Sequence, residues 1–288
     1  MEVAVLHVTM FQHTERQAMS DLTSATFDTY APFVESDANA AAEALRKQMN
    51  EQGYLFFRGL VPEEEVLTVR RAVLEVISAA GWVDPAYDLM EGRAMPGHKP
   101  LTEGQPEYAA AYRKVLRTPS FHNFPCHSAL MGVAQKLLSE EVFVHPRRIG
   151  RITFPGAVAF ATPPHQDYYY IRGSVETYSC WTPLGACPRE LGGLAVWPSS
   201  HNFGFIEHSI KHPGAVGGHG VPVDESQAHW HTADYGVGDA LFFRSYTIHK
   251  ALPNLTQDRL RLSTDNRYQL SNDEIDPAAL KPHGVSGK

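Results

Sequence analysis

Two histidines and one aspartate form the most informative pattern in the sequence. The stretch PPHQDYYY, residues 163–170, places His165 and Asp167 two positions apart. On a strand or at its end, such residues point the same way. A third candidate, His249, follows an apolar run in FFRSYTIHKALPN. Two histidines and one carboxylate on one face of a metal are typical of non-haem iron(II) oxygenases, which keep the other positions open. The sequence therefore predicts His165, Asp167 and His249 as metal ligands and catalytic residues.

Two arginines downstream could bind an acidic cosubstrate. In RLRLSTDNRY, residues 259–268, alternation places Arg259, Arg261 and Ser263 on one face of a strand, with leucines on the other. A buried guanidinium is costly unless it meets an anion, and a carboxylate is its natural bidentate partner. We expect one of the two arginines to bind the far carboxylate of a metal-chelating dicarboxylate, and the sequence leaves both as candidates.

The elements that must position these side chains lie in a β-rich second half. Between about residues 142 and 270, short apolar runs are separated by Pro and Gly, and no long helical period interrupts them. The runs are RRIGRITF, VETYSCWTPL, GGLAVWP, GDALFFRS and RLRLSTDNRY. Short strands at regular spacing favour an antiparallel sandwich or barrel, and we expect a jelly roll.

The first half is rich in helix signals. Helices are predicted over 40–52, ending at a C-cap glycine, and over 61–81, 106–117 and 127–138, with a strand in YLFFRGL. We therefore expect one oxygenase domain over residues 1–288. It would be mainly β with α, with a helix-rich layer over about 30–140 that covers the jelly-roll core at about 142–270.

Composition narrows the class of protein. The chain has 288 residues, a net charge of −7 and three cysteines. The acidic balance argues against general binding to nucleic acid or to anionic membranes. Three scattered cysteines favour a reducing compartment. The N-terminal stretch MEVAVLHVTMFQHTERQ lacks the basic and apolar regions of a signal peptide. We expect a cytoplasmic protein, and the sequence does not indicate its oligomeric state.

Several segments together resemble the phytanoyl-CoA dioxygenase-like branch of the iron(II)/2-oxoglutarate-dependent oxygenases. They are GYLFFRGLVPEEEV, PPHQDYYY, SCWTPLGACPRELGGLAVWPSSHN, GVGDALFFRSYTIHKALPN and RLRLSTDNRYQ, and they span roughly residues 50 to 270. The resemblance implies a double-stranded β-helix, iron held by His165, Asp167 and His249, and 2-oxoglutarate bound by Arg261 or Arg259.

The same resemblance implies further details of the site. Trp181 falls where the family places an aromatic residue near the cosubstrate, and Ala251 replaces a serine that the family usually has. Because Asp167 is present, halogenation is disfavoured, whereas hydroxylation or another oxidation of an unactivated C–H bond fits. Dioxygen and 2-oxoglutarate would be consumed to give succinate and carbon dioxide, with ascorbate as a candidate reductant.

Substrate contacts are predicted from position alone. We expect one or two of Tyr168, Tyr169 and Tyr170 to line the substrate pocket. Arg147, Arg148 and Arg151 could meet an acidic substrate, although a solvated face explains them equally well. The expected substrate is a small molecule, either a secondary metabolite or an amino-acid-like compound.

Two other functions stay open. One is a cupin-type dioxygenase that uses His229 and His231 and needs no 2-oxoglutarate. The other is a jelly-roll binding protein without turnover, which the intact set of candidate ligands and arginines argues against.

Overall fold

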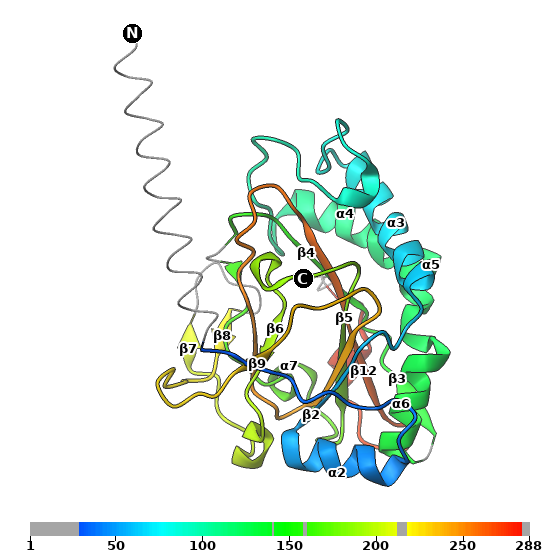
Figure 1. The fold of residues 1–288 in the computed structure, drawn as a ribbon, viewed down its shortest axis with the longest axis vertical. Helices are drawn as coiled ribbons and strands as arrows, with labels where there is room; N and C mark the ends of the chain where they lie inside the picture. The colour runs from blue at the N-terminus through cyan, green and yellow to red at the C-terminus, as the bar shows by residue number, and fades with distance from the viewer. Residues whose placement is uncertain (1–28, 140, 158–159, 212–217, 284–288) are drawn as a thin grey trace.

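The fold consists of two β-sheets that face each other, with helices packed outside the larger one (Figure 1). The structure is a computed structural model, and it describes residues 29–139, 141–157, 160–211 and 218–283. The prediction of no signal peptide concerns residues outside this part of the chain.

The larger sheet has the order β2-β10-β5-β12-β3, and β4 pairs with the other end of β12. Its ladders are antiparallel. The strands are β2 (Tyr54–Phe57), β3 (Val142–Val144), β4 (Ile149–Thr153), β5 (Tyr178–Pro183), β10 (Ala240–Arg244) and β12 (Arg261–Leu270).

The smaller sheet has the order β1-β9-β6-β11, and a separate hairpin pairs β7 with β8. Its strands are β1 (Ala31–Pro32), β6 (Leu194–Val196), β9 (His231–Thr232) and β11 (His249–Ala251), and the hairpin comprises β7 (Ile210–Lys211) and β8 (His219–Gly220). Only the β1–β9 pair is parallel among these strands of the described chain.

The helical layer precedes most of the strands in sequence and lies along one side of the larger sheet (Figure 1). It consists of α2 (Ala42–Gln52), α3 (Glu63–Ala79), α4 (Pro106–Leu116), α5 (Pro119–Asn123) and α6 (Ser128–Leu138). Helix α2 ends at Gly53, whose φ of 76° is favourable for glycine. The apolar stripe of α3, from Val66 to Ile77, is buried in the main core.

Alternation along the strands divides the larger sheet into two faces. Leu262 and Tyr268 of β12 point outward into the core under the helices, together with Phe242 of β10. The alternate residues of each strand point inward, and Trp181 and Phe243 pack there in a second core between the sheets. The inner face also carries the polar side chains described below.

The expected architecture is confirmed. The helices predicted at 40–52, 61–81, 106–117 and 127–138 are present within two residues at each boundary, and the five β-runs form β4, β5, β6, β10 and β12. Within the described chain, no helix is long and apolar enough to cross a membrane.

Candidate metal and cosubstrate site

The three predicted ligands come together at the end of the smaller sheet. His165 and His249 form an antiparallel β-bridge, with reciprocal backbone N–H···O distances of 3.0 and 3.1 Å. Asp167 follows at the start of the short helix α7 (Tyr168–Ile171). One isolated bridge is followed at once by a helical turn, so strand alternation does not continue through Asp167 and the tyrosines. The turn still brings Asp167 beside both histidines.

Both imidazoles are oriented by a backbone carbonyl two residues earlier. Nδ1 of His165 is 2.8 Å from the oxygen of Pro163, and Nδ1 of His249 is 3.0 Å from the oxygen of Thr247. A carbonyl only accepts, so Nδ1 carries the hydrogen and Nε2 keeps a free lone pair. Burial lowers the pKa of both rings, that of His165 to about 3. Both side chains are thus neutral at physiological pH, as metal ligands require.

Asp167 is held as a buried carboxylate. Nη2 of Arg267 donates to its two oxygens at 3.0 and 3.2 Å, and the hydroxyl of Ser179 donates to Oδ2. Burial raises the pKa of Asp167 and is the largest single effect, but Arg267, the two histidines and Ser179 together outweigh it, and the pKa lies below its usual range. The carboxylate therefore stays ionised, oriented by an arginine and a serine behind it.

The arrangement fits a divalent metal ion. The Nε2 atoms of His165 and His249 lie 3.8 and 3.9 Å from Oδ1 of Asp167. Two lone pairs and an anionic oxygen thus face one another without a hydrogen between them, which is unfavourable unless a cation lies there. Among the described residues, this is the one group of three His, Cys, Asp or Glu ligand atoms within 4.8 Å. Two nitrogens and one carboxylate oxygen suit iron(II).

A cavity between the sheets, called the inner cavity, adjoins the three ligands. The remaining residues that line it are Arg151, Thr162, Trp181, Leu194, Phe243, Ala251, Arg261, Asp265 and Arg267. Its polar lining comes mainly from the inner faces of β12 and β4, because Arg261, Ser263, Asp265 and Arg267 alternate along β12.

Arg261 is a buried cation at one end of this cavity. Its Nη2 donates to Thr153 at 2.8 Å and its Nη1 to Ser263 at 3.2 Å, while Nε has no acceptor in the part of the chain that the structure describes. No described carboxylate lies within ion-pair distance of Arg261, and burial lowers its pKa. Nε1 of Trp181, in the same cavity, is also buried without an acceptor. These donors suit an anionic oxygen of a bound ligand.

The two candidate arginines occupy different surroundings. Arg261 begins β12 and lines the inner cavity. Arg259 precedes the strand, forms an isolated bridge with Arg93 and is not among the residues that line the inner cavity. The expected alternation from 259 to 263 does not apply, because β12 starts at Arg261.

The three tyrosines point in different directions from α7. The ring of Tyr170 lies edge-on to His165, with ring centroids 5.7 Å apart. Tyr169 stacks on His208 at 4.2 Å, and Tyr168 packs edge-on against Tyr246 at 5.0 Å. Of the three, Tyr170 lines the same cavity as His165 and Asp167.

This second cavity, called the outer cavity, has a volume of about 140 Å³ and adjoins His165 and Asp167. Its lining also includes Glu103, Arg147, Ile149, Arg151, Thr162, Ile171, Arg267 and His283. Arg151 and Thr162 line both cavities, so the inner and outer spaces meet beside the metal ligands.

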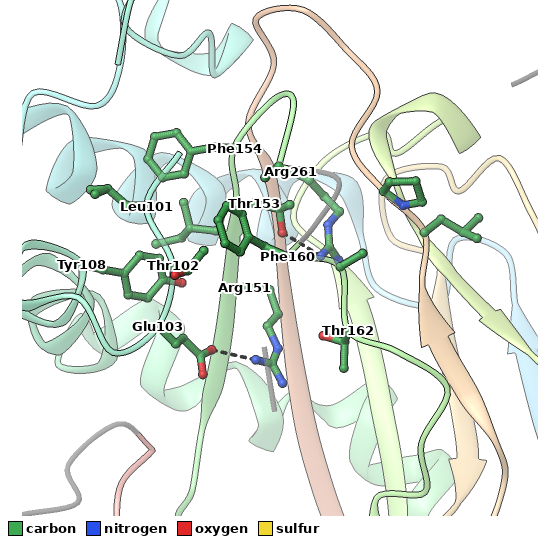
Figure 2. Close-up of a pocket in the computed structure, with 15 residues that line it drawn as sticks. Leu101, Thr102, Glu103, Tyr108, Arg151, Thr153, Phe154, Phe160, Thr162 and Arg261 are labelled. Carbon is green, nitrogen blue, oxygen red and sulfur yellow. Dashed lines mark hydrogen bonds and ion pairs between the residues drawn. The ribbon is translucent and has the colours of Figure 1, made fainter. Parts of the chain in front are cut away.

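Arg151 is fixed by carboxylates from two elements. It lies 2.7 Å from Glu103, in the loop before α4, and 3.0 Å from Asp265 of β12. Figure 2 shows Glu103 pointing toward Arg151 and Thr153 beside Arg261, in a pocket bordered by Tyr108 and Phe160. The loop before α4 is thereby attached to the inner face of the larger sheet.

Sequence reasoning missed Arg267, Ser179 and Asp265. Strand alternation could have indicated two of them, because two-residue steps from Arg261 reach Asp265 and Arg267. The β12–β5 ladder then pairs Arg267 with Ser179, which places both on the same face. The pairing of strands, however, cannot be read from one segment.

The other histidines and arginines weighed earlier lie in different environments. Nδ1 of His231 is 2.9 Å from the Tyr54 hydroxyl, and the group of three ligands among described residues does not include His231 or His229. Arg148 donates to the backbone oxygens of His122 and His145.

Comparison with known proteins gives the family. The phytanoyl-CoA dioxygenase (PhyH) model matches residues 49–262. The chain belongs to this family. It is 30% identical over 258 residues to a 1-deoxypentalenic acid 11-beta-hydroxylase of Streptomyces exfoliatus, covering 85% of this chain and 87% of the relative. It is 29% identical to a methylphosphonate hydroxylase of Gimesia maris, over 74% of this chain and 75% of that protein.

Among solved structures, the fold is similar to that of the epimerase SnoN, crystallised with Fe3+, alpha ketoglutarate and nogalamycin RO. The TM-score is 0.56 at 17% identity, covering 86% of this chain and 92% of that one. The predicted family and fold are therefore confirmed, and the chain is an iron(II)/2-oxoglutarate-dependent oxygenase.

Proposed function

We propose that the protein hydroxylates, or otherwise oxidises, an unactivated C–H bond of a small organic substrate. His165, Asp167 and His249 would hold the iron, and Arg261 would bind the far carboxylate of 2-oxoglutarate, with Trp181 as an additional donor. The observation that carries this proposal is that one cavity contains both a compact His–Asp–His group and the buried Arg261, which has no acidic partner among the described residues.

Iron with 2-oxoglutarate supplies the power to activate dioxygen and to break a strong C–H bond. The chain supplies geometry. The carbonyls of Pro163 and Thr247 orient the two imidazoles, and Arg267 with Ser179 orients Asp167. Such support fixes ligand direction and tautomer, which commonly affects metal affinity by about 10- to 100-fold.

Arg261 would bind the far carboxylate of 2-oxoglutarate and would not itself be a metal ligand. Thr153 and Ser263 fix its guanidinium from one side. The serine that the family usually has two residues after the distal histidine is Ala251, which lines the cavity and offers no hydroxyl. The cosubstrate carboxylate would therefore depend on Arg261 more heavily here.

The substrate would occupy the outer cavity and approach the iron from the side of Tyr170. The edge of this ring beside His165 would limit how the substrate lies, and we assign it a positioning role. Tyr169 and Tyr168 would shape the wall beside this cavity, since Tyr169 stacks on His208 and Tyr168 packs against Tyr246.

The nature of the relatives supports a small-molecule substrate, and secondary metabolism is the proposed setting. By their names, the two relatives described above are hydroxylases of 1-deoxypentalenic acid and of methylphosphonate. We propose no nucleic-acid or membrane partner, consistent with the net charge of −7. The three cysteines are free, which supports a cytoplasmic location.

The test separates this function from the cupin-type alternative. Purified protein with iron(II), 2-oxoglutarate and oxygen should form succinate, even slowly without substrate. His165→Ala should abolish succinate formation, whereas His231→Ala should retain it. Loss of succinate formation in His231→Ala but not in His165→Ala would overturn the proposal.

A further inference from the structure

Arg147 differs from the other arginines of the outer cavity. Arg151 and Arg267 are both paired with carboxylates. Arg147, by contrast, has no acidic partner within ion-pair distance among the described residues. Its Nε donates to the backbone oxygen of Lys281 at 3.0 Å and its Nη2 to that of Ala278. These carbonyls fix the guanidinium at the edge of the cavity and leave its charge uncompensated.

The surroundings of Arg147 favour an anion beside it. Partial burial lowers its pKa, and the positive charge of Arg267 lowers it further, while Asp276 acts in the opposite direction at longer range. A half-buried guanidinium next to a second cation is stabilised when a negatively charged ligand arrives. The cavity that it lines also contains the metal ligands His165 and Asp167.

A neighbouring surface cavity extends the positive charge outward. This basin, with a volume of about 460 Å³, is lined by Arg113, Leu116, Arg117, His122, Pro146, Arg148, Pro282 and His283. None of these residues is acidic. His283 lines the outer cavity as well, so the basin adjoins it. Clefts lined by one sign of charge attract ligands of the other sign, and this one lies on a protein of net negative charge.

We propose that the substrate is a carboxylic acid whose ionised carboxylate binds Arg147 at the edge of the outer cavity. Its hydrocarbon part would then extend toward the metal ligands, past Tyr170. The inference rests on the proposed function, because it assigns the substrate class of the same site. Arg147 thereby becomes the residue that selects acids over neutral compounds of the same shape.

The experiment compares acids with their methyl esters on full-length protein. Protein loaded anaerobically with iron(II) and 2-oxoglutarate is titrated with octanoic, dodecanoic and cyclohexanecarboxylic acid and with each methyl ester. Binding is measured by calorimetry and by the change in the visible band of the iron complex. We expect at least one acid to bind about 10- to 100-fold more tightly than its ester, as a charge-assisted hydrogen bond supplies.

Variants assign this preference to one side chain. In Arg147→Gln, the ratio of acid to ester affinity should fall toward one, and Arg147→Lys should retain part of it. Arg71→Gln is the matched control, because Arg71 is an exposed arginine of α3 that lines neither cavity. Before any acid or ester is added, the visible band of the complex with iron and 2-oxoglutarate should be the same in all three variants as in the unsubstituted protein. This control shows that the fold and the metal site are intact.

The outcomes distinguish the two proposals. If no band forms in the unsubstituted protein, the proposed function fails. If the band forms but no acid of the panel binds more tightly than its ester, the assignment of a carboxylate substrate is wrong. The same holds if Arg147→Gln keeps the full preference of the unsubstituted protein for acids.

Discussion

The two faces of strand β12 carry opposite chemistry within one run of residues. Facing the helices, Leu262 and Tyr268 are buried in the main hydrophobic core. Facing the smaller sheet, Arg261, Asp265 and Arg267 line the inner cavity. Both faces are nearly inaccessible to solvent, yet only the inner one buries charge. The strand thus stabilises the fold with one set of side chains and lines the candidate site with the other.

The difference shows why buried charge is tolerated here. On the helix-facing side, contact with apolar neighbours suffices. On the inner side, Arg267 is neutralised by Asp167 and Asp265 by Arg151. Arg261 alone lacks an anion among the described residues of this face, and we have proposed that 2-oxoglutarate provides one. Substitutions on the two faces should therefore have separable effects.

The largest effect on stability is expected on the helix-facing side. Phe242 of β10 is fully buried between the sheet and the helices, so Phe242→Ala should lower the free energy of unfolding by about 3–5 kcal/mol. Iron affinity of the folded variant should be unchanged, because Phe242 does not line the inner cavity. Chemical denaturation and an iron titration measure the two quantities, and a large loss of iron affinity would contradict the separation.

On the inner side, Arg267→Met should weaken iron binding by about 10- to 100-fold, because Asp167 loses the guanidinium that orients it and keeps it ionised. Thr264→Val is the matched control on the helix-facing side of the same strand, where Thr264 is buried. It should keep the iron affinity. Equal losses in the two variants would show that general damage to β12, rather than support of Asp167, causes the effect.

A smaller effect is expected at Glu103, which lies in the loop before α4 and pairs with Arg151. Burial would raise its pKa, but Arg151 and His283 outweigh burial and lower it to about 2. Because the folded pKa lies below the unfolded value of about 4.5, this contribution is present above pH 4.5 and is lost as pH falls toward 2. When the pH is lowered from 5 to 3, the free energy of unfolding should therefore fall in both proteins. The fall should be smaller in Glu103→Gln than in the unsubstituted protein, by about 1–2 kcal/mol. Urea denaturation at each pH measures this free energy. The same pH dependence in Glu103→Gln and the unsubstituted protein would refute this role.

The fold was largely predictable because its signals are local. Helix α2 ends at Gly53, and α3 has its apolar residues at helical spacing, so both could be placed from sequence. Strand β12 was predicted from alternation, but its start at Arg261 was not, because the bridge between Arg259 and Arg93 depends on a distant loop. Pairing between distant segments is a property of the folded chain alone.

The candidate site was predictable in its ligands and less so in their support. His165, Asp167 and His249 were predicted from type and spacing, and the turn into α7 brings the three side chains together. The contact between Arg267 and Asp167 joins residues 100 positions apart, and Arg147 has no acidic partner among the described residues. Neither fact is visible without the arrangement of the two sheets.

The central claim is that iron and 2-oxoglutarate bind together in the inner cavity, with Arg261 holding the cosubstrate. The most direct measurement is the anaerobic visible spectrum of the protein with iron(II) and 2-oxoglutarate, which shows a weak charge-transfer band when the keto acid chelates the metal. The band should appear in the unsubstituted protein, be lost in Asp167→Ala, and require far more 2-oxoglutarate in Arg261→Gln, while Arg259→Gln behaves normally. Iron binding without the band, or an effect of Arg259→Gln equal to that of Arg261→Gln, would contradict the account.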